Sequence, residues 1–124
     1  MRRATSSTAA MLALASLMFS ATAALAGYGA IAWDKETGKH GWSWDEPTPQ
    51  QAAAVAICNC GATGCKVIIH TGAGFCAALA TTANGKVAGA AARKTENAAW
   101  VWALANCNGV KAGDCVVWVS DCNK

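Results

Sequence analysis

The chain is 124 residues long and contains seven cysteines and six tryptophans, with a formal net charge of +3. Two of its ten basic residues are Arg2 and Arg3; without them, eight basic residues stand against seven acidic ones, which leaves about +1. No stripe of Lys and Arg remains that could follow a phosphate backbone, so nucleic acid is not an expected partner.

The first 26 residues have the pattern of a secretory signal peptide. Arg2 and Arg3 precede an apolar stretch over residues 9–19, and Ala24-Leu25-Ala26 fits an A-x-A cleavage site. The apolar stretch is too short for a spanning helix, which needs about 20 such residues. We therefore expect residues 1–26 to be removed on export. Residues 27–124 are then expected to form a single domain, periplasmic or secreted and without a membrane anchor.

In the first half of the mature chain, strands are predicted over residues 28–33 and 39–44, and a third over 67–69. A helix is predicted from a cap at Thr48 to about Cys58. Pro49 suits its first position, and Gln51 completes a capping box.

The second half predicts the same order of elements. Strands over residues 75–81 and 86–92 flank Asn84-Gly85, which predicts a type I′ hairpin turn. Thr95 is expected to cap a second helix that runs to about Asn106, and residues 115–119 form the closing strand.

The two halves repeat each other at an offset of 47 to 50 residues. The matched positions are Ala30-Ile31-Ala32 with Ala78-Leu79-Ala80, Thr48 with Thr95, Cys58 with Cys107, and Cys65 with Cys115. The predicted fold class is α+β, with two ββαβ repeats that form a mainly antiparallel sheet carrying two helices. A domain of this size has a small core, so disulfides are expected to stabilise it.

Several motifs along the chain together resemble one protein family. They are Tyr28 to Trp33, Gly41-Trp-Ser-Trp44, an alanine-rich helix that ends at a cysteine, Gly64-Cys65-Lys-Val67, Cys76-Ala-Ala-Leu-Ala80 and Gly113-Asp-Cys115-Val-Val-Trp118. This pattern is similar to the small secreted bacterial family catalogued as domain of unknown function 4189, over nearly all of the mature chain. The resemblance implies export and a disulfide-bearing α+β domain, and it carries over no reaction, cofactor or catalytic residue. Cys60 departs from the family pattern.

The cysteines predict three disulfides. The favoured set is Cys58–Cys65, Cys107–Cys115 and Cys76–Cys122, and the last bridge is expected to join the two halves. The first two pairs each link a helix end to the following strand, which a short loop can bring within disulfide reach. Cys60 is left over and could join two chains, while Cys60–Cys65 competes with the first pair because its spacing also permits closure.

Metal binding is the alternative use of these cysteines. Cys58, Cys60, Cys65 and His70 have the residue types of a tetrahedral zinc site, and a redox-active cysteine pair is a further alternative. An exported chain folds in an oxidising compartment, and the sequence has no paired Cys-x₂-Cys knuckle. Disulfides are therefore favoured, with no metal and no cofactor expected.

No pattern in the mature chain specifies a reaction. Its serines are Ser43 and Ser120 and its histidines are His40 and His70, and His40 and Ser43 should face opposite sides of one strand. Nucleophile elbow, P-loop and dinucleotide fingerprints are missing from the sequence. We therefore expect a protein that is not an enzyme.

The tryptophans are the strongest functional signal, since all six lie in residues 27–124. Trp42 and Trp44 share a strand face with His40, and these two tryptophans are expected to be exposed. Most of the other tryptophans, Trp102 among them, are expected in the core. An exposed aromatic face can anchor a partner protein or stack on a sugar. The hypothesis is an exported module that binds a protein or a cell-wall component. The alternatives are a carbohydrate binder through the exposed tryptophans and a small periplasmic hydrolase or hydrolase inhibitor.

Overall fold

The computed structural model describes residues 27–110 and 114–124, so the predicted signal peptide lies outside the described residues. Two successive ββαβ units make up the described part of the chain, which confirms the predicted α+β class and its repeat. The elements are β1 (Tyr28–Trp33), β2 (His40–Glu46), α1 (Pro49–Cys60), β3 (Lys66–Thr71), β4 (Cys76–Thr81), β5 (Ala88–Arg93), α2 (Glu96–Val110) and β6 (Val116–Cys122).

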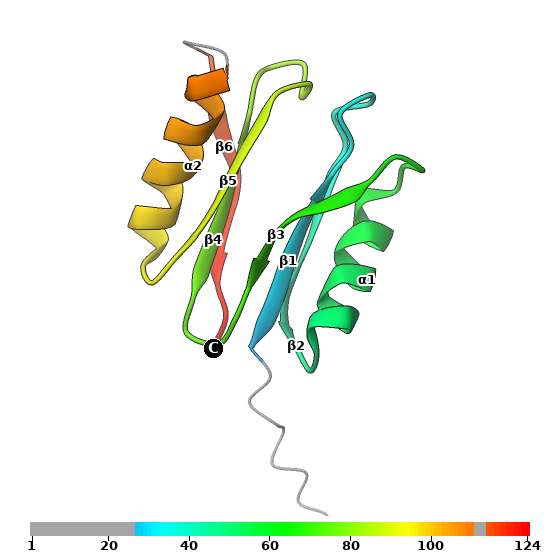
Figure 1. Ribbon diagram of the computed structural model, residues 1–124, viewed down its shortest axis with the longest axis vertical. Coiled ribbons are helices and arrows are strands. Elements are labelled where there is room, and N and C mark those ends of the chain that lie inside the picture. The colour runs from blue at the N-terminus through cyan, green and yellow to red at the C-terminus, as the bar shows by residue number, and fades with distance from the viewer. Residues whose placement is uncertain (1–26, 111–113) are drawn as a thin grey trace, which may run out of the picture.

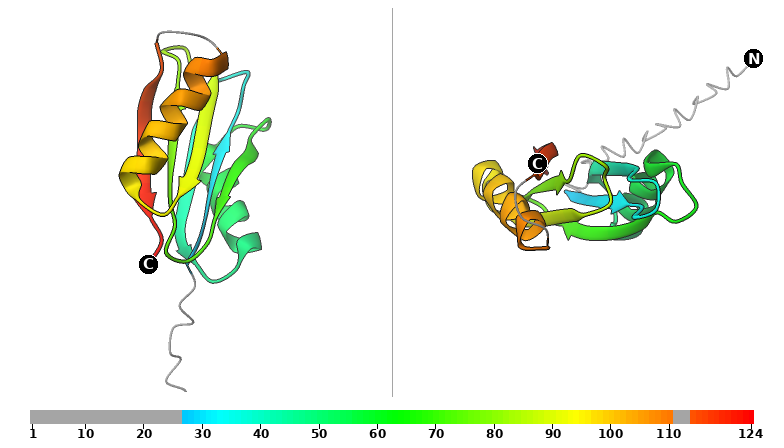
Figure 2. Two further views of the ribbon diagram at one scale, coloured as in Figure 1. Left: turned by 60° about the vertical axis from the view of Figure 1, so that its left-hand side comes forward. Right: turned by 90° about the horizontal axis from the view of Figure 1, so that it is seen from above.

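The strands are divided between two three-stranded sheets, and every pairing is antiparallel. In the first sheet β1 lies between β2 and β3, and in the second β4 lies between β5 and β6. The two sheets face each other, and each helix covers the outer face of its own sheet (Figures 1 and 2). The layers therefore run from α1 through the two sheets to α2.

Threonine caps begin both helices, as predicted. The backbone N–H of Gln51 donates to Thr48 Oγ1 at 3.1 Å, and that of Ala98 donates to Thr95 Oγ1 at 3.1 Å. These bonds satisfy amide groups that have no partner inside a helix. Among the described residues, no helix is long and apolar enough to cross a bilayer.

Small residues fill the layers between helix and sheet. Each helix buries three residues spaced by four, which are Ala52, Ala56 and Cys60 on α1 and Ala99, Ala103 and Cys107 on α2. The helices also lie directly over a glycine of the sheet. A Cβ added at Gly41 would lie 2.2 Å from the backbone nitrogen of Cys60, and one at Gly89 would lie 2.2 Å from that of Cys107. Only glycine permits so close an approach.

The layer between the two sheets holds the largest buried side chains. Ile31 of β1 and Leu79 of β4, which occupy matching positions of the repeat, are both fully buried there. Trp44, Ile69 and Val119 pack around them. Each half therefore buries the inner face of its sheet against the other half, which is why one half alone would lack a complete core.

The tryptophans differ from the prediction that most of them form the core. Trp42, Trp100, Trp102 and Trp118 are 40%, 43%, 49% and 55% exposed, while Trp33 and Trp44 are half-buried. Because the helices approach their sheets so closely, the space between them accepts alanine rather than an indole. The ring of Trp102 instead lies under the Arg93 guanidinium, whose carbon is 4.9 Å from the ring centroid.

Two of the three predicted disulfides are confirmed and one is wrong. Cys107–Cys115 and Cys76–Cys122 form, but Cys65 pairs with Cys60, and Cys58 is free and exposed. Cys60 continues the buried line of Ala52 and Ala56, so Cys60 rather than Cys58 corresponds to Cys107 in the repeat. Because the sulfurs of Cys60 and Cys65 are bonded to each other, the proposed zinc set and a dimer through Cys60 do not form in this structure.

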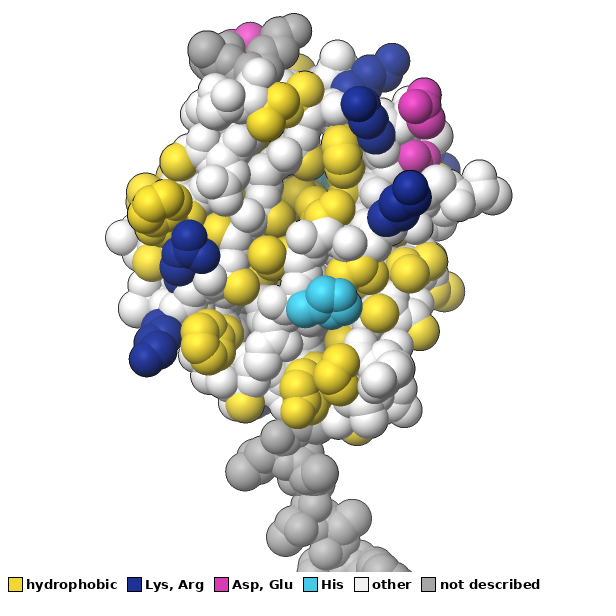
Figure 3. Space-filling model, in the orientation of Figure 1, with side chains coloured by type: hydrophobic (Ala, Val, Ile, Leu, Met, Phe, Trp, Pro, Cys, Tyr) yellow, Lys and Arg dark blue, Asp and Glu magenta, His cyan; other side chains and the backbone are white. Residues whose placement is uncertain are grey.

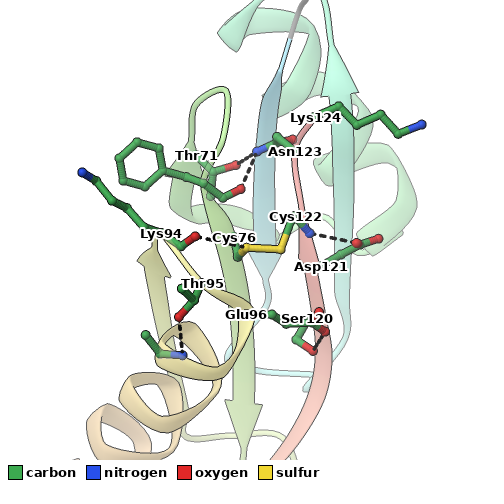
Figure 4. Close-up of a disulfide and its surroundings, with 12 residues drawn as sticks. Thr71, Cys76, Lys94, Thr95, Glu96, Ser120, Asp121, Cys122, Asn123 and Lys124 are labelled. Carbon is green, nitrogen blue, oxygen red and sulfur yellow. Dashed lines mark hydrogen bonds between the residues drawn. A yellow bond between two sulfur atoms is a disulfide. The ribbon is translucent and has the colours of Figure 1, made fainter.

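The Cys76–Cys122 bridge does not join the two halves, contrary to the prediction. Its cysteines lie opposite each other on adjacent strands β4 and β6, both in the second half. Asn123, the next residue, makes that connection instead (Figure 4). It is buried, its Nδ2 donates to Thr71 Oγ1, and its Oδ1 accepts from the backbone N–H of Asp45 at 3.0 Å.

The turn between β4 and β5 is not the predicted type I′ turn, because only Gly85 of the Asn84-Gly85 pair has a positive φ. Asn84 Oδ1 instead accepts from the backbone N–H of Lys86 at 3.0 Å. This turn also meets the first half of the chain, since Trp33 Nε1 donates to the Gly85 carbonyl at 2.7 Å.

Candidate functional site

Three aromatic side chains gather where β2 of one sheet lies near β6 of the other. The His40 ring stacks on Trp42 with centroids 5.9 Å apart and an interplanar angle of 24°, and its centroid lies 6.4 Å from that of Trp118. We call His40, Trp42 and Trp118 the edge cluster. Both indoles are exposed, so the cluster presents a large amphipathic surface.

Strand alternation in β2 sets the orientation of the first two members. Gly41 lies against α1, and Ser43 Oγ donates to the Ala52 carbonyl of α1 at 2.7 Å. His40, Trp42 and Trp44 alternate with these residues and therefore face away from α1. Trp42 is exposed as predicted, whereas Trp44 packs into the layer between the sheets.

Trp118 joins the cluster because β6 contains a bulge. Val119 lies opposite Leu79 and Val117 lies opposite Ala80, so Trp118 is the extra residue. Bulges redirect side chains, and this one brings Trp118 Nε1 within 2.7 Å of Thr81 Oγ1. Sequence reasoning missed Trp118 because hydrophobic periodicity does not show where a bulge falls.

A shallow groove of about 240 Å³ opens beside the edge cluster. Its walls come from the turns that close the two hairpins and from the cluster itself. The lining residues are Thr37, Gly38, His40, Thr81, Ala83, Asn84, Gly85 and Trp118. The site is therefore built by both halves of the chain.

The outer edges of the sheets are protected against pairing with another strand. Asn59 Nδ2 donates to the Trp42 carbonyl of β2 at 3.0 Å, and Asn106 Nδ2 donates to the Ala90 carbonyl of β5 at 3.0 Å. The edge strands β3 and β6 carry register shifts at matching places. Such devices disfavour the addition of a strand from another chain at these edges.

The structure does not gather the remaining polar candidates into a catalytic site. His40 and Ser43 lie on opposite faces of β2, His70 is exposed on β3, and the Ser120 hydroxyl donates to Glu96 Oε1 at 2.8 Å. Within residues 27–110 and 114–124, no group of three His, Cys, Asp or Glu residues could hold a metal ion. The edge cluster is thus the best-formed candidate surface.

The fold and this surface define a small disulfide-stabilised α+β protein built from two ββαβ halves. The chain belongs to the family described as "Domain of unknown function (DUF4189)", whose model matches residues 28–122, and this confirms the resemblance seen in the sequence. It is similar to Rv1813c from Mycobacterium tuberculosis, whose structure was determined by NMR. The two share 31% identity with a TM-score of 0.56, and the match covers 78% of this chain and 75% of that one. Comparison with curated proteins gives no match.

Proposed function

We propose that this protein is an exported, non-enzymatic module that binds a protein partner through the edge cluster. The main support is that both indoles are exposed yet held in place. His40 stacks on Trp42, and Trp118 Nε1 donates a hydrogen bond to Thr81. Tryptophan, together with tyrosine and arginine, is enriched among the residues that dominate the binding free energy of protein interfaces.

Export is supported by the disulfides and by the leader sequence. Three bridges in a chain of this length are typical of proteins that fold in oxidising compartments. The A-x-A run that ends at Ala26 supplies the expected cleavage site. The protein is therefore proposed to act in the periplasm or outside the cell.

A protein partner fits the edge cluster better than a sugar does. The predicted sugar platform of Trp42 and Trp44 does not form, because His40 stacks on the Trp42 ring and Trp44 packs between the sheets. The adjoining groove offers space for a side chain projecting from a partner. On the opposite side of the molecule, where β3 and β5 face the viewer in Figure 3, basic side chains stand in separate groups with hydrophobic ones between them, so that side presents no continuous basic stripe for a nucleic acid.

The hydrolase alternative has no support from these side chains. The Ser43 hydroxyl is engaged with a helix carbonyl and the Ser120 hydroxyl with a carboxylate. Neither serine pairs with a histidine in the described part of the chain, so the base that would activate it as a nucleophile is missing there.

The test is capture of a partner from periplasmic and cell-wall extract by the oxidised chain without residues 1–26. Trp42→Ala and Trp118→Ala should each abolish capture while the protein stays folded, although Trp118→Ala should melt slightly lower because its hydrogen bond to Thr81 is lost. Trp102→Ala is the matched control, since this indole is similarly exposed but lies on α2, and it should retain capture. Equal capture by all three variants would contradict the proposal, as would hydrolysis of a wall or peptide substrate that His40→Ala abolishes.

A further inference from the structure

A second exposed aromatic surface lies on α2 and takes no part in the edge cluster. Trp100 and Trp102 have similar exposure, but residues two apart on a helix face different sides. The Arg93 guanidinium covers the ring of Trp102. Trp100 instead lines an open recess of about 570 Å³ together with Glu96, Asn97 and Ser120.

The recess combines an indole with polar groups from two elements. Glu96 and Asn97 precede Trp100 by four and three residues, so all three share one face of α2. Ser120 comes from β6, and its hydroxyl donates to Glu96 Oε1 at 2.8 Å. One carboxylate oxygen is thereby oriented, and Oε2 is free to accept further hydrogen bonds.

The polar wall of this recess is anchored rather than mobile. Ser120 lies two residues before Cys122, whose bridge to Cys76 fixes β6 to β4 (Figure 4). Glu96 occupies the first position of α2, where the helix dipole favours its negative charge. A ligand at Trp100 would therefore meet prearranged hydrogen-bonding groups, which lowers the entropic cost of binding.

We propose that this recess binds a pyranose sugar. The Trp100 ring would stack on the apolar face of the sugar, while the Glu96 carboxylate and the Asn97 amide bind its hydroxyls. A carboxylate, an amide and a hydroxyl supply both acceptors and donors, as a polyhydroxylated neutral ligand requires.

The proposal does not depend on the edge cluster, and its experiment separates the two surfaces. The oxidised, ¹⁵N-labelled chain without residues 1–26 is titrated with cellotriose and with triacetylchitotriose, two β-1,4-linked probes that distinguish a plain from an acetamido sugar. Two compounds serve as controls. Sorbitol supplies hydroxyls without a pyranose ring, and methylammonium chloride supplies a cation. We expect saturable shifts of the Trp100 indole N–H with at least one trisaccharide and with neither control compound.

Variants locate the binding. Trp100→Ala should abolish the shifts, Trp100→Phe should retain part of the affinity, and Glu96→Gln should weaken it about tenfold because a charged hydrogen-bond acceptor is lost. Trp102→Ala and Trp42→Ala should bind as the unchanged protein does, and thermal melts check that all variants fold.

Four results would overturn the proposal. They are no saturable response to either trisaccharide, an equal response to sorbitol, a response to methylammonium alone, and loss of sugar binding in Trp42→Ala. The last would assign the sugar to the edge cluster.

Discussion

The Cys76–Cys122 bridge should contribute more to the stability of this protein than either of the other disulfides. The three bridges close loops of very different length, with sequence separations of 46 for Cys76–Cys122, 8 for Cys107–Cys115 and 5 for Cys60–Cys65. A disulfide lowers the entropy of the unfolded chain by an amount that grows with the logarithm of this separation. At 25 °C the relation gives about 4 kcal/mol for the longest loop, about 2.5 kcal/mol for the intermediate one and about 2 kcal/mol for the shortest.

The assay is urea unfolding of three double variants in which both cysteines of one bridge are replaced by alanine. All should be made with Cys58→Ser, because a free exposed thiol can exchange with the remaining bridges. Removing Cys76–Cys122 should lower the free energy of unfolding by about 4 kcal/mol, a large part of the 5 to 15 kcal/mol typical of a domain. Peptide mapping without reduction should first show Cys60 joined to Cys65 in the parent protein.

Removal of Cys76–Cys122 that lowers the free energy of unfolding no more than removal of Cys60–Cys65 would contradict this ranking. Loss of buried packing cannot explain such a result, since Cys60 and Cys76 are both almost fully buried. Such a result would mean that the unfolded chain already restricts the segment between Cys76 and Cys122 when the bridge is absent. If peptide mapping instead showed Cys58 joined to Cys65, the orientation of α1, in which Cys60 rather than Cys58 faces the sheet, would be wrong.

Three further changes test other parts of the fold. Gly89→Ala should lower the free energy of unfolding by about 2 to 3 kcal/mol, because the added Cβ would meet backbone atoms of α2 at Cys107. Gly72→Ala is the control: a Cβ there would have nothing within 4 Å, so the free energy of unfolding should change by less than about 0.5 kcal/mol in the same denaturation assay. Trp44→Ala should lower the melting temperature, unlike Trp42→Ala, because the Trp44 ring packs between the sheets. The Thr37 hydroxyl donates to Asp34 and holds the pKa of that carboxyl below its ordinary value of 3.8. The stabilisation from Asp34 is therefore complete above pH 3.8 and is lost as the pH falls through the lower pKa of the folded protein. Asp34→Asn should make the free energy of unfolding fall less steeply with acid, and an unchanged acid dependence would contradict this account.

The candidate surfaces were only partly predictable. Trp42 and His40 follow from strand alternation around Ser43, a pattern that the sequence displays directly. Trp118 joins them through a bulge and from the opposite sheet, and neither feature leaves a periodic signal. The recess at Trp100 combines an i, i+4 pair that the sequence contains with Ser120, which only the packing of α2 beside β6 brings near.

The cysteine pairing shows the same division between local and long-range information. The spacing of Ala52, Ala56 and Cys60 marks one face of a helix, so the sequence alone held the signal that Cys60 faces the sheet and Cys58 does not. The apparent repeat of Cys58 with Cys107 concealed it. The cross-strand position of Cys76 and Cys122, in contrast, depends on the order of strands in the second sheet.

The sequence by itself determined the elements, their order and their caps, because a threonine cap, a strand alternation or a helical face depends on residues only a few positions apart. Only the tertiary structure decided that six strands form two sheets and that Ile31 and Leu79 share one core. It also decided that four tryptophans remain exposed. These outcomes depend on how closely each helix approaches its sheet over Gly41 and Gly89, and on each half burying its inner face against the other. The contacts between the halves join residues as far apart in the sequence as Ile31 and Leu79, and no local pattern records them.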